Sequence, residues 1–475
     1  MSCKSTSQKL QGSLGELGRG KQGQEGRVSQ LEKSKASQLQ KSRGKSPEGQ
    51  ANQSQEGKAG LVQKGPSRLP HTLRAGFGKK LLATFLTFVL LTGMLGLMTG
   101  LTACGGGGES KSQADSPTSA GPLLKIGSVG PLTGSASIYG SSAKRGAEIA
   151  VEEINAQEKD FQLAFLMHDD EADGEKGINA YNQLKDWGMQ LLMGAVTTGS
   201  CVAVAAESYE DRIFTLTPSA SSGEVTAGKD NVFQVCFTDP NQGIKAANYI
   251  ADHFADKKVG VIYNNSDPYS TGIYNAFKQE FGQLGKELVA VETYPDDTNA
   301  DFSAQLSSLK AAGADLVLLP IYYTPASVIL KQAQDLKYAP KFFGLDGMDG
   351  ILDIEGFDQA LAEGLMLMTP FNPWSEEAKV QAFVAKYQEK YDELPNQFAA
   401  DGYDGIYALY QAFKAQALTT DLAPADLCEK LVKTFTGDFS YDGLTGKQMT
   451  WSSSGEVSKE PTICVIQDGK YADVK

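Results

Sequence analysis

The chain has 475 residues, of which 41% are hydrophobic, so two lobes or domains with sizeable cores are expected rather than one. Its net charge of -13 is unevenly divided, because the residues before Cys104 carry +11 and the remainder therefore carries -24. An acidic body of this size excludes nucleic acid as a partner, since it has few cations to replace phosphate counterions.

The first 103 residues are predicted to precede the folded part. Residues 1–77 are rich in Ser, Gln, Gly and Lys, a composition that predicts a disordered, low-complexity leader. Residues 78–103 contain two lysines, an apolar run and then small residues, the order typical of a signal peptide. The run is also long enough for an uncleaved membrane helix. Both interpretations place the rest of the chain outside the membrane.

The end of this segment, Leu-Thr-Ala followed by Cys104, resembles a bacterial lipobox. The resemblance implies that Cys104 is lipidated and anchors the protein to the outer face of the bacterial cell membrane. Residues 104–121 are rich in Gly and Ser and are expected to form a flexible tether.

Four further cysteines lie in the body of the chain: Cys201, Cys236, Cys428 and Cys464. An even number in an oxidising compartment suggests disulfides. Proximity in the sequence favours the pairs 201–236 and 428–464, although four cysteines allow three pairings. No C-x-x-C spacing is present, so neither a metal site nor redox chemistry is expected.

From residue 123 onward, short apolar runs alternate with amphipathic stretches. The alternation predicts repeated β-α units, which form parallel sheets with helices on both faces. It occurs in two runs and therefore predicts two α/β lobes. The expected strands are 124–129, 161–167, 191–194, 213–216, 258–263, 287–293 and 315–321. The expected helices are 143–155, 177–187, 272–284, 302–311 and 325–336.

Hydroxyl-rich loops follow three of the expected strands, at residues 130–140, 197–200 and 217–222. Ligands of open parallel sheets bind beyond the carboxyl ends of the strands. Hydroxyls and free N–H groups at helix starts suit a carboxylate. Any one of these residues could be an ordinary helix cap, but three such loops together indicate a binding site.

With these loops located, the chain resembles the Leu/Ile/Val-binding family of type I periplasmic binding proteins over residues 123–411. The matching segments include 130–134 (GPLTG), 217–221 (TPSAS), 237–243 (FTDPNQG), 269–272 (YSTG), 301–304 (DFSA) and 344–347 (GLDG). The resemblance implies two Rossmann-like lobes joined by a three-crossover hinge. Lobe 1 would comprise 122–239 and 371–449, and lobe 2 would comprise 240–370 and 450–475.

The resemblance also implies a ligand held between the lobes. Thr198, Ser219 and Ser221 would bind the carboxylate of an amino acid, and Asp346 would pair with its ammonium group. The side chain would contact Tyr139, Tyr269, Tyr322 and Phe398. The loop around Thr198 is one residue longer here than in the family, so Thr197 or Ser200 could take its role.

An enzyme is not expected. The chain has three histidines, and His168 beside Asp169 and Asp170 is better explained as a solvated loop than as a metal site. No cofactor is predicted. The predicted function is that of a monomeric, lipid-anchored protein that captures an amino acid, with branched-chain or aliphatic residues favoured, for the permease and ATPase of an ABC importer. The alternatives are an amide, urea or aromatic acid as ligand, or a role as an extracellular ligand sensor.

Overall fold

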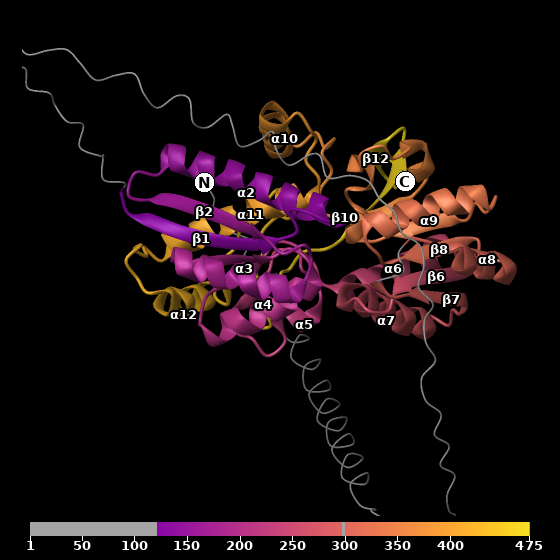
Figure 1. Cartoon of the computed structure of the whole chain (residues 1–475), viewed down its shortest axis with the longest axis horizontal. Helices are drawn as coiled ribbons and strands as arrows, with labels where there is room; N and C mark the ends of the chain where they lie inside the picture. The colour runs from indigo at the N-terminus through magenta and orange to yellow at the C-terminus, as the bar shows by residue number, and fades with distance from the viewer. Residues whose placement is uncertain (1–120, 297–299, 475) are drawn as a thin grey trace, which may run out of the picture. The chain divides into compact units, whose positions relative to one another are not determined.

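The computed structural model describes residues 121–296 and 300–474, which form two α/β lobes (Figure 1). The first lobe contains a five-stranded sheet in the order β2-β1-β3-β4-β5 with every neighbouring pair parallel. Its strands are β1 (Leu123–Gly130), β2 (Gln162–Asp169), β3 (Leu191–Ala195), β4 (Thr215–Thr217) and β5 (Val232–Gln234). Its helices are α2 (Ser137–Gln157), α3 (Gly174–Trp187), α4 (Thr198–Glu210), α5 (Gly223–Thr226), α10 (Ala378–Tyr391), α11 (Gln397–Ala415) and α12 (Pro424–Phe435).

The second lobe contains a seven-stranded sheet in the order β12-β11-β10-β9-β8-β6-β7. Its strands are β6 (Val259–Asn264), β7 (Leu288–Tyr294), β8 (Leu316–Leu319), β9 (Lys341–Gly344), β10 (Met366–Thr369), β11 (Thr462–Gln467) and β12 (Lys470–Asp473). Its helices are α6 (Asp239–His253), α7 (Pro268–Gln283), α8 (Ser303–Ala312) and α9 (Tyr323–Asp335), with 3-10 turns η2 (Asp346–Met348), η3 (Ile351–Asp353) and η4 (Gln359–Ala362). The predicted α/β fold with two parallel-dominated sheets is thus confirmed.

The last two strands differ from the prediction of purely parallel sheets, since β11 pairs antiparallel with both β10 and β12. The turn between β11 and β12 is formed by Asp468 and Gly469, both at positive φ. An Asp-Gly pair at positive φ matches the twist of a tight hairpin. This dipeptide was the sequence feature that could have revealed the hairpin.

Helices α2 and α11 pack closely because glycines face the neighbouring backbone. A Cβ on Gly146 would lie 1.8 Å from the carbonyl oxygen of Ala399, and one on Gly402 would lie 2.2 Å from that of Ala143. Any side chain at these two positions would force the helices apart. The contact joins the N-terminal part of the first lobe to its C-terminal part.

The order of the elements implies that the chain passes between the lobes after β5, after β10 and before β11. Residues before the third passage still belong to the first lobe: the Trp451 indole donates a hydrogen bond to the carbonyl of Gln234 (2.8 Å) and packs in the core of that lobe. We therefore infer that the third crossing follows Lys459, later than the boundary at 449–450 suggested by the sequence.

Within the described residues no disulfide joins the cysteines, so the predicted pairs 201–236 and 428–464 are wrong. Proximity in sequence misled here, because Cys428 lies in the core of the first lobe and Cys464 in that of the second. Cys201 and Cys236 are likewise buried. Burial raises the pKa of Cys201 and of Cys428 to about 12, which makes these thiols poorly reactive.

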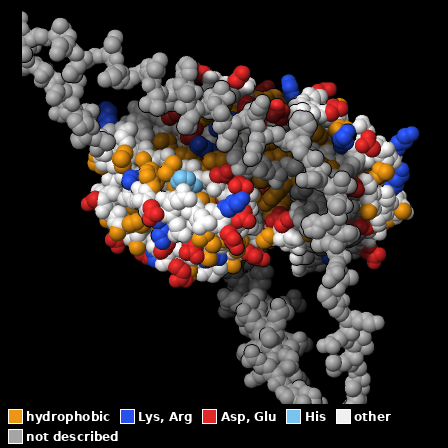
Figure 2. Space-filling model, in the orientation of Figure 1, with side chains coloured by type: hydrophobic (Ala, Val, Ile, Leu, Met, Phe, Trp, Pro, Cys, Tyr) orange, Lys and Arg blue, Asp and Glu red, His pale blue; other side chains and the backbone are white. Residues whose placement is uncertain are grey.

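The predicted leader (1–77), signal peptide (78–103), lipidation site Cys104 and most of the tether lie outside the described residues. Within residues 121–296 and 300–474, every helix is too short or too polar to span a membrane. Figure 2 shows acidic and basic side chains interspersed on the visible face, where the basic side chains of the described residues do not gather into one patch.

Candidate functional site

A small cavity lies where the carboxyl ends of the strands from both sheets meet. Its walls are Tyr139, Val196, Thr197, Thr198, Ser219, Tyr269, Tyr322, Asp346, Gly347 and Phe398. These residues come from the loops or helix starts that follow β1, β3, β4, β6, β8 and β9, together with one residue of α11. The placement is the one expected of a ligand site in open parallel sheets.

The structure brings seven of the eight predicted ligand residues to this cavity. The exception is Ser221, which is buried beside the start of α6, where its carbonyl accepts from the Asp239 N–H (2.9 Å). Ser200, considered as a substitute for Thr198, faces Gly177 of α3 instead. Thr197, the other substitute, does line the cavity.

Aromatic rings form most of the cavity wall. The ring of Tyr139 lies 4.3 Å from that of Phe398 and 5.3 Å from that of Tyr322, and the rings of Tyr322 and Tyr269 are 5.0 Å apart, measured between centroids. The open volume between them is about 10 Å³, roughly the space of one water molecule. The cavity as it stands is therefore tightly closed.

Asp346 is the acidic group of the cavity. Its Oδ1 accepts hydrogen bonds from the Tyr269 hydroxyl and from the Gly347 N–H, both at 2.8 Å. The side chain is buried, and this burial raises its pKa to about 6. Among residues 121–296 and 300–474, no Lys, Arg or His lines the cavity, so Asp346 has no cationic partner there in this part of the chain.

Two glutamines that the sequence analysis did not single out hold the backbone of Asp346. Its N–H donates to Oε1 of Gln242 (3.1 Å), and its carbonyl accepts from Nε2 of Gln397 (2.7 Å). Gln242 lies in α6 and Gln397 opens α11. Gln242 occurs within the 237–243 segment, whereas the sequence around Gln397 offers no comparable pattern.

The opposite wall supplies hydrogen-bond donors. Helix α4 begins at Thr198, so the free N–H groups of its first turn lie at the cavity. The buried hydroxyl of Thr197 has no hydrogen-bond partner among the described residues. The Ser219 hydroxyl is already engaged, donating to the carbonyl of Val196 at 2.7 Å. A helix start with a spare hydroxyl is suited to a carboxylate.

Hydrogen bonds between the lobes close the cavity. The Tyr139 hydroxyl donates to the Gly347 carbonyl (2.5 Å) and accepts from the Tyr323 N–H (3.2 Å). The Tyr323 hydroxyl in turn accepts from the N–H of Ile138 (3.1 Å). Tyr139 and Ile138 belong to the first lobe and the others to the second, so these bonds hold the two lobes together beside the cavity.

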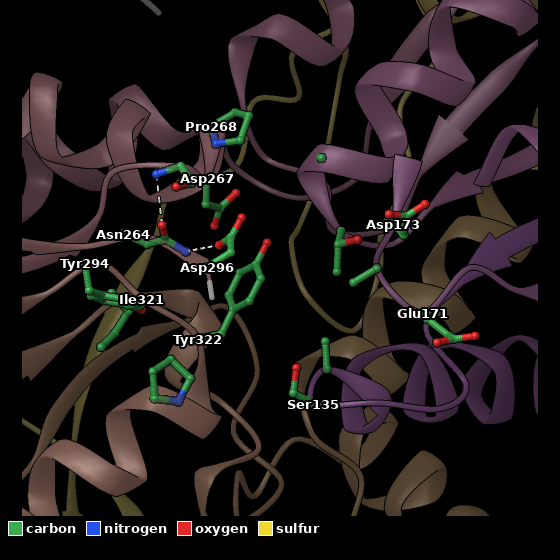
Figure 3. Close-up of a pocket in the computed structure, with 16 residues that line it drawn as sticks. Ser135, Glu171, Asp173, Asn264, Asp267, Pro268, Tyr294, Asp296, Ile321 and Tyr322 are labelled. Atoms are coloured by element: carbon green, nitrogen blue, oxygen red, sulfur yellow. Dashed lines mark hydrogen bonds between the residues drawn. The ribbon is translucent and has the colours of Figure 1, made fainter. Parts of the chain in front are cut away.

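A larger cleft of about 380 Å³ adjoins the cavity and shares Thr197 and Tyr322 with it. On the side of the second lobe, Figure 3 shows the carboxylates of Asp267 and Asp296 close to each other beside Tyr322. Neither Lys, Arg nor His lines this cleft. Burial and, to a smaller extent, Asp296 raise the pKa of Asp267 to about 7.

The solvated loop predicted at His168, Asp169 and Asp170 is wrong, because His168 lies in strand β2 and Asp170 is buried. The carboxylate of Asp169 accepts hydrogen bonds from the N–H of Leu132 (2.8 Å) and from the hydroxyl of Thr133 (2.6 Å). Asp170 accepts from the N–H of Ala172 (2.8 Å). Asp169 thus holds the loop after β1, and Asp170 holds the turn after β2. Within residues 121–296 and 300–474 no group of three or more His, Cys, Asp or Glu side chains could hold a metal ion.

The buried carboxyls lead to a prediction about pH. Burial raises the pKa of Asp170 and Asp346 to about 6 and that of Asp353 to about 7. Between roughly pH 4, the usual pKa of Asp in an unfolded chain, and these values, the folded state binds protons that the unfolded state does not. The free energy of unfolding is therefore expected to rise as the pH falls from about 8 to about 5.

Urea denaturation of the ligand-free protein across this range would measure the effect. Asp353→Asn should reduce the slope of stability against pH, because it removes one of the groups that bind a proton on folding. A stability that increases from pH 5 to pH 8 would contradict the prediction.

The two lobes and the cavity between them define a protein that captures a small solute. The family described as periplasmic binding protein matches residues 124–470, and the chain therefore belongs to this family. It is 29% identical over 323 residues to Leu/Ile/Val-binding protein homolog 1 of Brucella abortus (strain 2308), a match covering 66% of this chain and 84% of the relative.

Solved structures agree with this assignment. The leucine-binding protein LivK of Thermotoga maritima MSB8 is 26% identical with a TM-score of 0.65, covering 74% of this chain and 98% of its own. LivJ of Streptococcus pneumoniae in complex with isoleucine is 26% identical with a TM-score of 0.66, covering 74% and 97%. A solute-binding protein of R. palustris in complex with benzoate, at 21% identity and a TM-score of 0.66, covers 74% and 95% and shares the fold.

Proposed function

We propose that the protein binds an α-amino acid between its lobes and delivers it to the permease and ATPase of an ABC importer. The observation that carries the proposal is the buried carboxylate of Asp346, which has no cation beside it. An ammonium group would pair with this charge, while the start of α4 and the Thr197 hydroxyl would receive the carboxylate. Both charges of a zwitterion would then be compensated after their removal from water.

The relatives support an aliphatic side chain, since one is named for Leu, Ile and Val and another holds isoleucine. The aromatic wall of Tyr139, Tyr269, Tyr322 and Phe398 is consistent with an apolar group. An aromatic acid is the less favoured alternative, because it would fill the carboxylate position and leave Asp346 without a cation. Anchoring through Cys104 would keep the protein at the outer face of the membrane.

A thermal-shift screen of the full chain against the twenty amino acids, urea, short amides and aromatic acids tests the proposal. Binding to the native state raises the melting temperature by mass action. A rise confined to amino acids is expected. A rise only with benzoate, urea or an amide would contradict the zwitterion site while leaving solute binding intact.

Tyr322 is expected to determine which side chain is preferred. Its ring borders both the inner cavity and the outer cleft, so Tyr322→Ala enlarges the space available to a ligand side chain. We expect the order of affinities among leucine, isoleucine and phenylalanine to change in favour of the larger ligand, as measured by isothermal titration calorimetry. An unchanged order would assign Tyr322 to packing alone.

A further inference from the structure

On the side of the second lobe, the outer cleft is lined by two acidic side chains, Asp267 and Asp296. Asp296 is exposed, and its Oδ1 accepts from the side-chain amide of Asn264. Asp267 accepts from the N–H of Tyr269 at 3.2 Å and so caps α7. No ion pair is formed by either carboxylate, although the chain has fourteen ion-pair contacts among its described residues.

One of the two acidic residues on the facing wall differs in this respect. Glu171 forms an ion pair with Lys176 (2.7 Å), and Asp173 caps α3 by accepting from the N–H of the same lysine (2.9 Å). In Figure 3 the side chains of Glu171 and Asp173 lie on the opposite side of the cleft from Asp267 and Asp296. Among the described residues, the second lobe therefore contributes two carboxylates without an ion pair to the cleft, and the facing wall contributes one, Asp173.

The path from the inner cavity to these carboxylates is lined by an aromatic side chain and a polar one. Tyr322 and Thr197 each border both spaces. Thr197 is 4% exposed, and its buried hydroxyl lacks a hydrogen-bond partner among the described residues. A ligand whose charged end lies at Asp346 and Thr197 would extend along Tyr322, where an apolar stem packs well, toward Asp267 and Asp296.

We propose that Asp296 and Asp267 form a subsite for the cationic end of a basic amino acid such as lysine or arginine. The inference rests on the proposed function, because it takes the α-amino and α-carboxyl groups to be held in the inner cavity. The proposed ligand has an aliphatic side-chain stem, as the relatives suggest, and carries a positive charge at the end of that stem. Burying part of that charge is favourable only where a carboxylate meets it.

The test compares ligands of equal or nearly equal length that differ in charge. Calorimetry on the full chain would measure lysine against norleucine, arginine against citrulline, and leucine as a reference. We expect each cationic ligand to bind about tenfold more tightly than its neutral counterpart, the effect of one charge-assisted hydrogen bond. Asp296→Asn should reduce both ratios to within about twofold.

Two further variants keep the result interpretable. Asp267→Asn retains a capping side chain for α7 and is also expected to reduce both affinity ratios. It replaces Asp296→Asn as the test if that variant does not fold. Asp252→Asn, at an exposed position of α6 outside the cleft, removes the same charge and should leave both affinity ratios unchanged.

If leucine and norleucine bind and the cationic ligands bind no better, the subsite is refuted while the proposed function stands. If no amino acid binds, the proposed function itself fails, and the subsite fails with it.

Discussion

Asp346→Asn is expected to lower the affinity for an amino acid by about 30-fold to a thousandfold or more, the range for removing one partner of a buried charge pair. The amide has the size of the carboxylate and can still accept from the Tyr269 hydroxyl and the Gly347 N–H. The variant therefore removes the charge that faces the ligand ammonium while largely keeping the hydrogen bonds around it. Calorimetry with the best ligand of the thermal-shift screen measures the loss.

The melting temperature of the ligand-free variant separates a binding role from a structural one. Because burial raises the pKa of Asp346, the charged form costs free energy in the folded state, and its removal should leave stability unchanged or increased at neutral pH. Asp346→Ala should also abolish binding. Affinity retained within about threefold in these variants would show that Asp346 does not meet the ammonium group. Asp252→Asn serves as the charge-matched control.

Lys459→Met is expected to cost about 3–5 kcal/mol of stability, because it leaves a buried carboxylate without its cation. The ammonium of Lys459 donates to Asp401 (2.8 Å) and to the Thr445 hydroxyl (2.7 Å). The two charged side chains are only 1% and 2% exposed. This pair attaches the segment before the third crossing to α11.

A double variant distinguishes the loss of the pair from the loss of packing. Asp401→Leu combined with Lys459→Met removes both charges and should recover most of the stability, since apolar residues of similar volume can replace a buried ion pair. Urea denaturation at pH 7.5 compares the single and double variants. A Lys459→Met protein as stable as the parent, or a double variant less stable than both single variants, would contradict the assignment.

Regular structure was the most predictable part of this chain. Buried parallel strands are nearly continuous apolar runs, as in β8 (Leu316–Leu319), and the helices between them repeat apolar residues at helical spacing. These patterns depend only on neighbours along the chain. The prediction for residues 143–155 nevertheless began too late, since α2 starts at Ser137, where small and polar residues are buried by α11 and the second lobe rather than by a local pattern.

Contacts between distant segments were not predictable in the same way. The disulfide pairs failed because they were chosen by sequence proximity, whereas the fold separates Cys428 and Cys464 into different cores. The sequence predicted the loop that contains Ser219 and Ser221 as part of the binding site. Only the path of the backbone decides that Ser219 lines the cavity and that Ser221 lies beside Asp239.

By itself, the sequence determined the α/β class, the two lobes, the acidic character and the loops that could hold a ligand, because each depends on composition or on short-range periodicity. The tertiary structure alone decided which side chains meet. It placed Tyr139 against Gly347 across the lobes, put Gln242 and Gln397 behind Asp346, and set Asp296 beside Asp267 at the cleft. These contacts arise where two sheets bring the ends of their strands together, and no local pattern in the chain encodes that meeting.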